Sequence, residues 1–433
     1  MAEYPHDEFA VVDVDAWEVL DSRGRPTVAA SVRLAGGATG AVAVPSGASV
    51  GTYEAHELRD GGERYAGRGV RRAVDHVRGD LREAVLGLDA SRQQQVDTAL
   101  TEADGTLDLS RLGANAVLAV SVAAAVAAAT CARLPLHAYL SPSGTAPLLP
   151  LPMVNIVSGG AHAGGAVDVQ DVLAVPMRAT SFAEALEVVS RVRQATVEVA
   201  ADAGHQVTLV ADEGGLAAAL PDNRAALELV VRGIERAGLR PGDDVGLAVD
   251  VAATQFHHDG RYVLAAEGRS LDAGAWIDEL ADWIAALPIV SVEDPLADDD
   301  WEGWAYAAAT LRGVQLLGDD LFVTSLQRLG HGIEAGIANA VLVKPNQNGT
   351  LSGARAVVDR AREAGYATVV SARSGETEDA WLADLAVGWS AGQLKVGSTT
   401  RSERTAKWNR LLRIEHEAGA DARYAGADAL VRS

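Results

Sequence analysis

Short apolar runs between residues 207 and 396, each closed by a charged side chain, constrain the fold more than any other feature of the sequence. The runs are rich in β-branched residues and do not alternate with polar ones, which is typical of strands buried on both faces of a parallel sheet. Segments with helical patterns, such as residues 273–287 and 352–364, separate them. This repeat predicts an α/β fold with a TIM-like (β/α)8 barrel, whose chemistry lies at the carboxyl ends of the strands. The residues that close the runs are Glu213, Asp250, Glu293, Asp320, Lys344, Arg373 and Lys395.

Three of these closing residues are carboxylates on different runs, namely Asp250, Glu293 and Asp320. Gathering them at one end of a barrel is costly without a cation. Carboxylate oxygens with no histidine or cysteine in the same runs suit a hard ion such as Mg²⁺, which leaves positions open for substrate oxygens. Because lysines and an arginine close other runs, we expect a small anionic, oxygen-rich substrate beside the metal.

The composition narrows the class of protein. The chain has 433 residues, a net charge of −22 and one cysteine, Cys131. Its length fits one large barrel plus a smaller domain, and its acidity argues against partners such as nucleic acid or an anionic membrane. A lone cysteine cannot form an internal disulfide and no signal peptide is evident, so a cytoplasmic protein is expected. Residues 115–132 are nearly uncharged, but their alanine content and marginal length favour a buried helix over a membrane span.

The beginning of the chain has a different pattern from the barrel runs. Turn chemistry at residues 22–26 joins two segments of strand character, which indicates an antiparallel meander. The three strand-like segments are residues 9–20, 27–34 and 40–44. Helical spacing over residues 70–85 and the apolar stretch after Gly113 predict two helices behind this sheet.

These elements predict an N-terminal α+β domain over residues 1–140 that caps a barrel domain over residues 141–433. The two prolines within residues 142–147 mark the linker. Residues 45–51 have two interpretations. Serine and glycine are ordinary turn residues, but the segment could also be a mobile loop whose amides and Ser49 hydroxyl meet a phosphate or metal.

A series of motifs, in one order along nearly the whole chain, resembles the enolase family. The motifs are LDSRGRPTV, PSGASVG, YEAHELRD, LGANAVLAVS, SGGAHAG, DVQD, DEGG, VEDPL, GDDLFVT, VLVKPNQNGTL, RSGETED and RSERTAKWNRLLRIE. The resemblance implies a Mg²⁺-dependent hydro-lyase that removes water from 2-phosphoglycerate to give phosphoenolpyruvate. It also implies two metal ions, the second of them substrate-dependent, and assembly as a homodimer or higher homo-oligomer.

Matching the motifs residue by residue gives three groups of site residues. The implied metal ligands are Asp250, Glu293, Asp320 and Ser49. The implied substrate-binding residues are His162, Asp171, Lys395 for the carboxylate, and Arg373 and Ser374 for the phosphate. The implied catalytic pair is Lys344, which removes the proton next to the carboxylate, and Glu213, which protonates the departing hydroxyl. A histidine in a glycine-rich loop can also be merely structural, and that interpretation of His162 stays open.

The chain departs from the family pattern beside the phosphate and the leaving hydroxyl. Ala372 stands where the family has histidine, and Asp171 where it has glutamate. Further departures are Val50, Pro345, Asn348 and residues 216–219. The proposed metal and base positions are unchanged, which favours an altered substrate over lost catalysis.

Several functions follow from this pattern. A methyl group in place of an imidazole leaves space for a substrate that is bulkier on phosphorus. This favours a specialised paralogue of the carboxyphosphonoenolpyruvate synthase type, from antibiotic biosynthesis. The alternative is a housekeeping enolase of glycolysis. A non-catalytic binding role and a racemase-type activity are further interpretations, which the intact ligands and the phosphate-binding RSGETED motif respectively disfavour.

Overall fold

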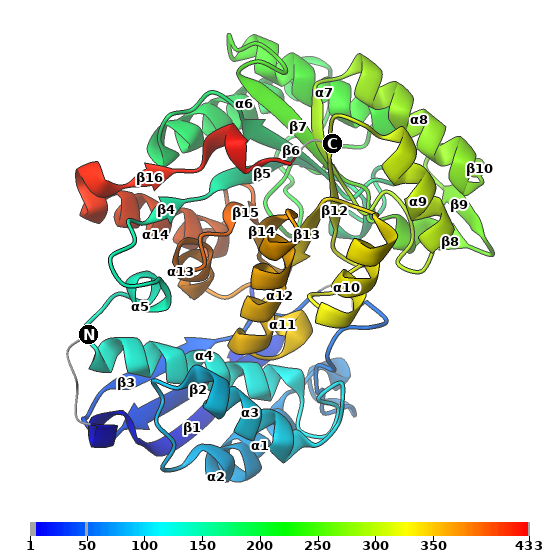
Figure 1. The fold of residues 1–433 in the computed structure, drawn as a ribbon. Coiled ribbons are helices and arrows are strands. Elements are labelled where there is room, and N and C mark those ends of the chain that lie inside the picture. The colour runs from blue at the N-terminus through cyan, green and yellow to red at the C-terminus, as the bar shows by residue number, and fades with distance from the viewer. Residues whose placement is uncertain (1–5, 48–50, 432–433) are drawn as a thin grey trace.

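The computed structural model describes residues 6–47 and 51–431, with a smaller N-terminal part set against one end of a barrel (Figure 1). Strands β1 (Val11–Leu20), β2 (Pro26–Leu34) and β3 (Thr39–Ala43) form an antiparallel sheet in that order, which confirms the predicted meander. Asp21 makes the first turn, because its Oδ1 accepts the backbone N–H groups of Arg23 and Arg25, each at 2.8 Å.

Helices cover one side of this sheet. The predicted helix over residues 70–85 is present, interrupted by a π-helical turn at Val77–Leu81. The helices are α1 (Arg71–His76), α2 (Arg82–Val85), α3 (Gln93–Asp104), α4 (Ala114–Cys131) and α5 (Leu136–Leu140).

Helix α4 is the apolar stretch for which burial was predicted. Among the described residues it alone is long and apolar enough to meet the criteria for a membrane span, and 83% of that window is buried inside the protein. It approaches β3 so closely that a Cβ on Gly40 would stand 2.2 Å from the Ala123 carbonyl oxygen. Glycine at position 40 therefore lets the helix pack on the sheet.

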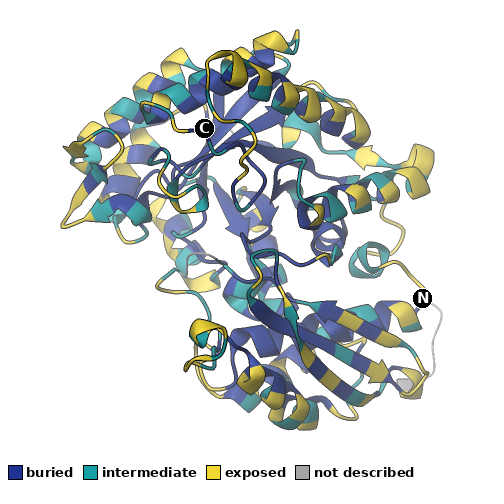
Figure 2. Ribbon diagram, turned by 180° about the vertical axis from the view of Figure 1, so that it is seen from behind, coloured by how far each residue is buried: buried dark blue, intermediate teal, exposed yellow. Residues whose placement is uncertain are grey.

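The second part is a closed barrel in the order β11-β12-β13-β14-β15-β5-β6-β7, which confirms the predicted fold class. Its interior is buried throughout (Figure 2). The strands are β5 (Leu151–Ser158), β6 (Asp171–Pro176), β7 (Val245–Asp250), β11 (Ile289–Glu293), β12 (Gln315–Gly318), β13 (Ala340–Val343), β14 (Ala367–Ser371) and β15 (Gly392–Gly397).

Two expectations about the barrel are wrong. The run at residues 207–213 is not a barrel strand, and two of its apolar side chains face solvent, with Leu209 59% and Val210 40% exposed. The sheet is also not wholly parallel, since β6 pairs antiparallel with both β5 and β7. No α-helix lies between β5 and β6, so the chain turns back directly.

The remaining helices surround the barrel (Figure 1). They are α6 (Phe182–Asp202), α7 (Asn223–Arg236), α8 (Ala273–Ala286), α9 (Trp301–Thr310), α10 (Leu326–Ala335), α11 (Pro345–Asn348), α12 (Leu351–Glu363), α13 (Trp381–Gly388) and α14 (Ser402–Ala418). Short pairings β8 (His257–His258), β9 (Arg261–Leu264) and β10 (Arg269–Leu271) form a separate sheet, and β4 (Leu148–Leu149) pairs with β16 (Arg423–Tyr424).

The N-terminal part packs on the carboxyl ends of the strands. Ser46 forms a β-bridge with Gly375, which follows the end of β14. On the flank, the first backbone N–H groups of α12 donate to Ser121 Oγ at 3.0 Å and to Asp97 Oδ2 at 2.8 Å. Both acceptors belong to the N-terminal part, which therefore caps a barrel helix as well as covering the mouth.

Candidate active site

The mouth of the barrel encloses one pocket that collects most of the predicted site residues. Those that line it are His162, Glu213, Asp250, Asp320, Lys344, Arg373, Ser374 and Lys395. Asp171 and Glu293 lie directly behind the lining, where they contact His162 and Lys395 respectively. Ser49, the remaining predicted ligand, lies outside the described residues, as do residues 48 and 50 of the predicted loop 45–51.

Lys395, on β15, lies between the carboxylates that end β7 and β11. Its Nζ is 2.6 Å from Asp250 Oδ2 and 2.6 Å from Glu293 Oε2. Burial alone favours the neutral amine, but the two carboxylates raise the pKa of Lys395 well above its ordinary value. Burial and the nearby Asp250 in turn raise the pKa of Glu293. The ammonium group therefore offsets part of a crowded negative charge.

Lys344 follows β13, and its amine contacts the carboxylate of Asp319, the residue before the predicted metal ligand Asp320. Burial disfavours both charged forms. The mutual attraction nevertheless outweighs burial, so Asp319 raises the pKa of Lys344 and Lys344 lowers the pKa of Asp319. The two groups form a buried ion pair at the pocket.

Asp294, Asp319 and Asp320 form one acidic group, with one oxygen from each lying within 4.8 Å of the others. Asp294 has a φ of 41° and accepts the backbone N–H groups of Asp319 at 2.9 Å and Asp320 at 2.7 Å. Burial and Asp319 raise the pKa of Asp320 to about 7, and burial and Asp320 raise that of Asp294. Negative charge is thus concentrated here beyond what Lys344 offsets.

On the opposite wall, His162 stands between two carboxylates. Its Nδ1 is 2.8 Å from Asp171 Oδ2, and its Nε2 is 4.0 Å from Glu213 Oε1. Burial alone would lower the pKa of His162, but Asp171 and Glu213 raise it to about 9. Ser158 Oγ donates to Asp171 at 2.7 Å, which fixes the aspartate that orients the imidazole. At neutral pH His162 is therefore a cation.

Glu213 reaches the pocket although its run is not a strand. Two helices, α6 and α7, connect β6 to β7, and residue 213 lies in the turn between them. The turn is tied to the barrel because the Glu213 carbonyl accepts the Ser398 N–H at 2.8 Å and the Leu216 N–H donates to Ile156 at 2.8 Å. The backbone of neighbouring segments therefore positions Glu213.

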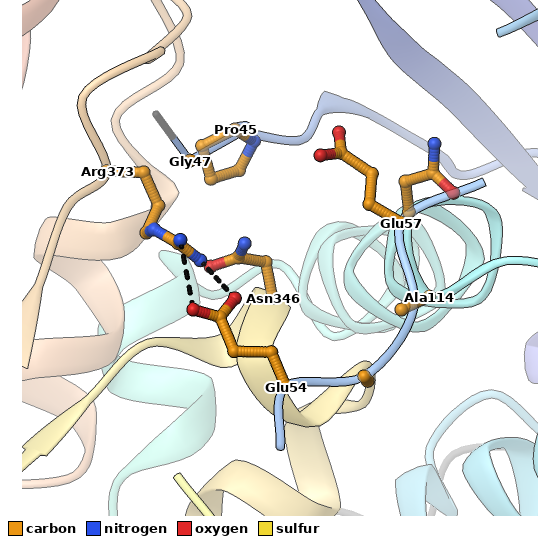
Figure 3. Close-up of a pocket in the computed structure, with 9 residues that line it drawn as sticks. Pro45, Gly47, Glu54, Glu57, Ala114, Asn346 and Arg373 are labelled. Carbon is orange, nitrogen blue, oxygen red and sulfur yellow. Dashed lines mark hydrogen bonds and ion pairs between the residues drawn. The ribbon is translucent and has the colours of Figure 1, made fainter. Parts of the chain in front are cut away.

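Arg373 follows β14 and is held in a fork by Glu54 of the N-terminal part (Figure 3). Nη1 is 3.0 Å from Glu54 Oε2 and Nη2 is 3.3 Å from Glu54 Oε1. Each side chain is only 5% exposed. Burial disfavours the charged guanidinium, but Glu54 more than compensates, and the pKa of Arg373 is raised.

Two buried cations on α14 hold the backbone around Arg373 and Ser374. Arg404 is fully buried and donates to the carbonyl oxygens of Arg373, at 2.6 Å, and of Ser374 and Val396. Lys407 donates to the Thr377 carbonyl at 2.6 Å. Helix α14 thus fixes the geometry of the loop that carries the predicted phosphate ligands.

Sequence reasoning missed Asp294, Asp319, Glu54 and Arg404. Each of the two aspartates lies next to a predicted metal ligand, and the motifs VED and GDD do not show which of two adjacent acids faces the pocket. Glu54 and Arg404 belong to the quoted motifs YEAHELRD and RSERTAKWNRLLRIE. Neither closes an apolar run, so only the three-dimensional contacts reveal their proximity to the pocket.

The acidic group has the chemistry of a site for a hard divalent cation. Its donors are carboxylate oxygens, which Mg²⁺ prefers, and the raised pKa of Asp320 reflects negative charge that a cation would offset. His162, Asp171 and Glu213 form a second group that could hold a metal, but the positive charge of His162 already offsets one of its two carboxylates.

Family comparisons match both parts of the chain. Residues 11–140 match the family described as "Enolase, N-terminal domain", and residues 146–433 match "Enolase, C-terminal TIM barrel domain". The second match alone covers more than half of the sequence, and it includes every barrel strand around the pocket. The chain therefore belongs to the enolase family and is a Mg²⁺-dependent hydro-lyase of the enolase superfamily.

Proposed function

We propose that this protein removes water from a substrate of the 2-phosphoglycerate type, with Lys344 as base and Glu213 as acid. One observation carries the proposal: the amine and the carboxylate line a single pocket that also contains an arginine and an acidic group. A small acid bearing phosphorus oxygens would meet a complementary group for each of its charges.

The metal would be held by Asp250 and Glu293 together with Asp319 or Asp320, which follow β12. Asp294, the third member of the acidic group, accepts the backbone N–H groups of Asp319 and Asp320 and would hold these two residues in place. We favour Asp319 over the sequence-based assignment of Asp320, because the pKa of Asp319 is lowered whereas that of Asp320 is raised. When bound, Mg²⁺ supplies positive charge that stabilises negative charge on the oxygens of the substrate carboxylate. A second ion held partly by Ser49 remains part of the proposal.

Lys344 would accept the proton from the carbon next to the substrate carboxylate. An amine accepts a proton only when it is neutral, and Asp319 raises the pKa of Lys344. The base role therefore requires the Asp319 charge to be engaged elsewhere, as it would be in a metal ligand. Lys395 would hold the substrate carboxylate and favour neutral Lys344 by like-charge repulsion.

Glu213 would deliver a proton to the departing hydroxyl, on the wall opposite Lys344. His162 and Asp171 stand on this side of the pocket, with His162 Nε2 4.0 Å from Glu213 Oε1. Because the imidazolium favours ionised Glu213, the acid role requires Glu213 to take up a proton when the substrate binds. Arg373 and Ser374 would hold the phosphorus oxygens, since a guanidinium forks onto two oxygens and a hydroxyl adds a third contact.

The finer proposal is that the substrate carries a carboxyl group on phosphorus, so that the product is carboxyphosphonoenolpyruvate. Ala372, which lines the pocket next to Arg373, supports it, because its small side chain leaves volume near the phosphorus position. The test is direct competition between 2-phosphoglycerate and its carboxyphosphono derivative. A higher kcat/KM for the plain substrate would contradict this assignment and leave the reaction type intact.

Two substitutions at Ala372 identify the physical cause of any preference. Ala372→His should raise kcat/KM for 2-phosphoglycerate and lower it for the larger compound. Ala372→Val adds volume without a hydrogen-bonding group, so a shared effect of both variants would assign the preference to pocket volume. An effect of histidine alone would assign it to the imidazole.

A housekeeping enolase that converts 2-phosphoglycerate to phosphoenolpyruvate is the second candidate. Glu54 favours it, because its carboxylate lines the hollow beside Arg373 and would repel an additional carboxylate (Figure 3). We further propose that the protein is a cytoplasmic homo-oligomer. We also propose that each chain consists of two domains, residues 1–140 and residues 141–433. Analytical ultracentrifugation tests the oligomer.

A further inference from the structure

The carboxylate of Glu54 pairs with the guanidinium of Arg373 and so partly neutralises the charge that Arg373 would otherwise offer to a ligand. Both terminal nitrogens of the guanidinium bind this one side chain, at 3.0 and 3.3 Å. Arg373 also lines the catalytic pocket, so the same cation faces the proposed phosphate position and Glu54. An anion that binds there meets an arginine whose charge is already shared.

Glu54 is itself firmly placed. Its Oε1 accepts the Gly51 N–H at 3.0 Å, and the Gln347 amide lies 3.4 Å from the same oxygen. The Gln347 amide also donates to Asp319 Oδ1 at 3.0 Å. Glu54 is thus connected both to the predicted anion ligand and to the acidic group beside Lys344, although it comes from the other part of the chain.

The small hollow around Glu54 offers Arg373 no other unpaired carboxylate among the described residues. Pro45, Gly47, Glu57 and Asn346 line it together with Glu54 and Arg373 (Figure 3). Glu57 is paired with Arg59 at 2.7 Å, so its charge is offset from outside the hollow. Arg373 is the only cation lining the hollow in the described part of the chain, and Glu54 is its direct partner.

We propose that Glu54 is a specificity-determining residue that weakens the hold of Arg373 on phosphorus-borne anions, by an amount that grows with the negative charge of the anion. This inference deepens the proposed function and rests on its assignment of Arg373 to the phosphorus oxygens. The expected benefit to the enzyme is release, because an anionic phosphate group dissociates faster from a partly neutralised arginine than from an unpaired one.

Glu54→Gln isolates the charge effect, because glutamine keeps an acceptor oxygen of similar reach but carries no charge. We expect KM for 2-phosphoglycerate to fall about tenfold, the scale measured for charges at partly desolvated pairs, with no rise in kcat. KM for the carboxyphosphono derivative should fall further. Inorganic phosphate, measured by calorimetry in the presence of Mg²⁺, should bind correspondingly tighter.

Glu57→Gln is the matched control, since it removes one carboxylate from the same hollow without touching Arg373. It should leave KM and phosphate affinity within about twofold of the parent protein, as expected for a partly exposed pair. Glu54→Ala removes the acceptor oxygens of residue 54 as well as its charge. Comparing it with Glu54→Gln therefore separates the effect of the charge on Arg373 from the effect of holding Arg373 in position.

A rise in KM for Glu54→Gln together with a fall in kcat would overturn the proposal, because Glu54 would then position Arg373. Equal effects of Glu54→Gln and Glu57→Gln would overturn it as well. If the parent protein dehydrates neither substrate, the proposed function fails, and phosphate binding alone then decides the role of Glu54. Tighter phosphate binding by Glu54→Gln supports the inference in either case.

Discussion

At the scale of single residues, the two neighbouring aspartates after β12 have opposite electrostatic surroundings. Asp319 pairs with Lys344 and is ionised, whereas burial and Asp319 hold the pKa of Asp320 at about 7. The first is therefore suited to hold a cation at neutral pH, and the second is protonated in part of the molecules. Sequence motifs alone cannot separate two adjacent acids.

Replacing each aspartate by asparagine should reveal this difference. One unit charge about 4 Å from another contributes roughly 4 kcal/mol at an effective dielectric of about 20. Asp319→Asn should therefore lower kcat/KM on the order of 10³-fold, as Lys344→Met should, and Asp320→Asn by clearly less. Steady-state kinetics at saturating Mg²⁺ measures both. The reverse order would restore Asp320 as the ligand.

His162 gives the fold a pH-dependent contribution. Its pKa is raised to about 9 from an ordinary 6.5, so its pairing stabilises the folded state fully below pH 6.5 and progressively less as the pH approaches 9. Near pH 6, the free energy of unfolding of the parent protein should be about 2 to 3 kcal/mol higher than that of the His162→Gln variant. Denaturant titrations should show this difference disappearing near pH 10. A constant difference would mean that His162 is not charged.

At the scale of elements, helix α12 begins on groups supplied by the N-terminal part. Asp97 Oδ2 accepts the Ser352 N–H at 2.8 Å, and burial raises the pKa of that aspartate. Asp97→Ala should cost about 1 to 2 kcal/mol in unfolding free energy, as for loss of a helix cap. It should also speed hydrogen exchange at the start of α12. The control is Glu102→Ala, an exposed position on the same helix α3, which should change neither quantity.

The elements also show how far the sequence could lead. The runs that end at Asp250, Glu293, Lys344 and Lys395 each contain a barrel strand. Continuous β-branched runs are typical of strands that are buried on both faces of a sheet. The run at Glu213 has the same composition, yet it is a turn between two helices. Composition alone cannot distinguish a barrel strand from this turn. The difference lies in the topology, because β6 runs antiparallel to both of its neighbours, and the turn between α6 and α7 then carries Glu213 to the barrel mouth.

Across the molecule as a whole, the net charge of −22 opposes the compact state by self-repulsion, which bound cations reduce. A ligand that binds only the folded state at 100 times its Kd stabilises by about 2.7 kcal/mol. Mg²⁺ should therefore raise the Tm of the parent protein, and a chelator should reverse the shift and stop turnover. Asp319→Asn should lose most of the shift. NaCl at matched ionic strength controls for general screening, and a shift as large with NaCl would exclude a specific site.

Arg404 and Lys407 lie on α14, which follows all the barrel strands in the sequence, yet they hold the backbone at the barrel mouth. Segments made much earlier, such as that of Glu213, share this support, because the Asp212 carbonyl also lies within reach of Arg404. During synthesis on the ribosome, the capping part emerges before helix α14. A nascent chain can thus contain every barrel strand while the loop of Arg373 and Ser374 still lacks the support of α14, so a premature stop codon shortly before residue 402 would yield a protein without catalysis.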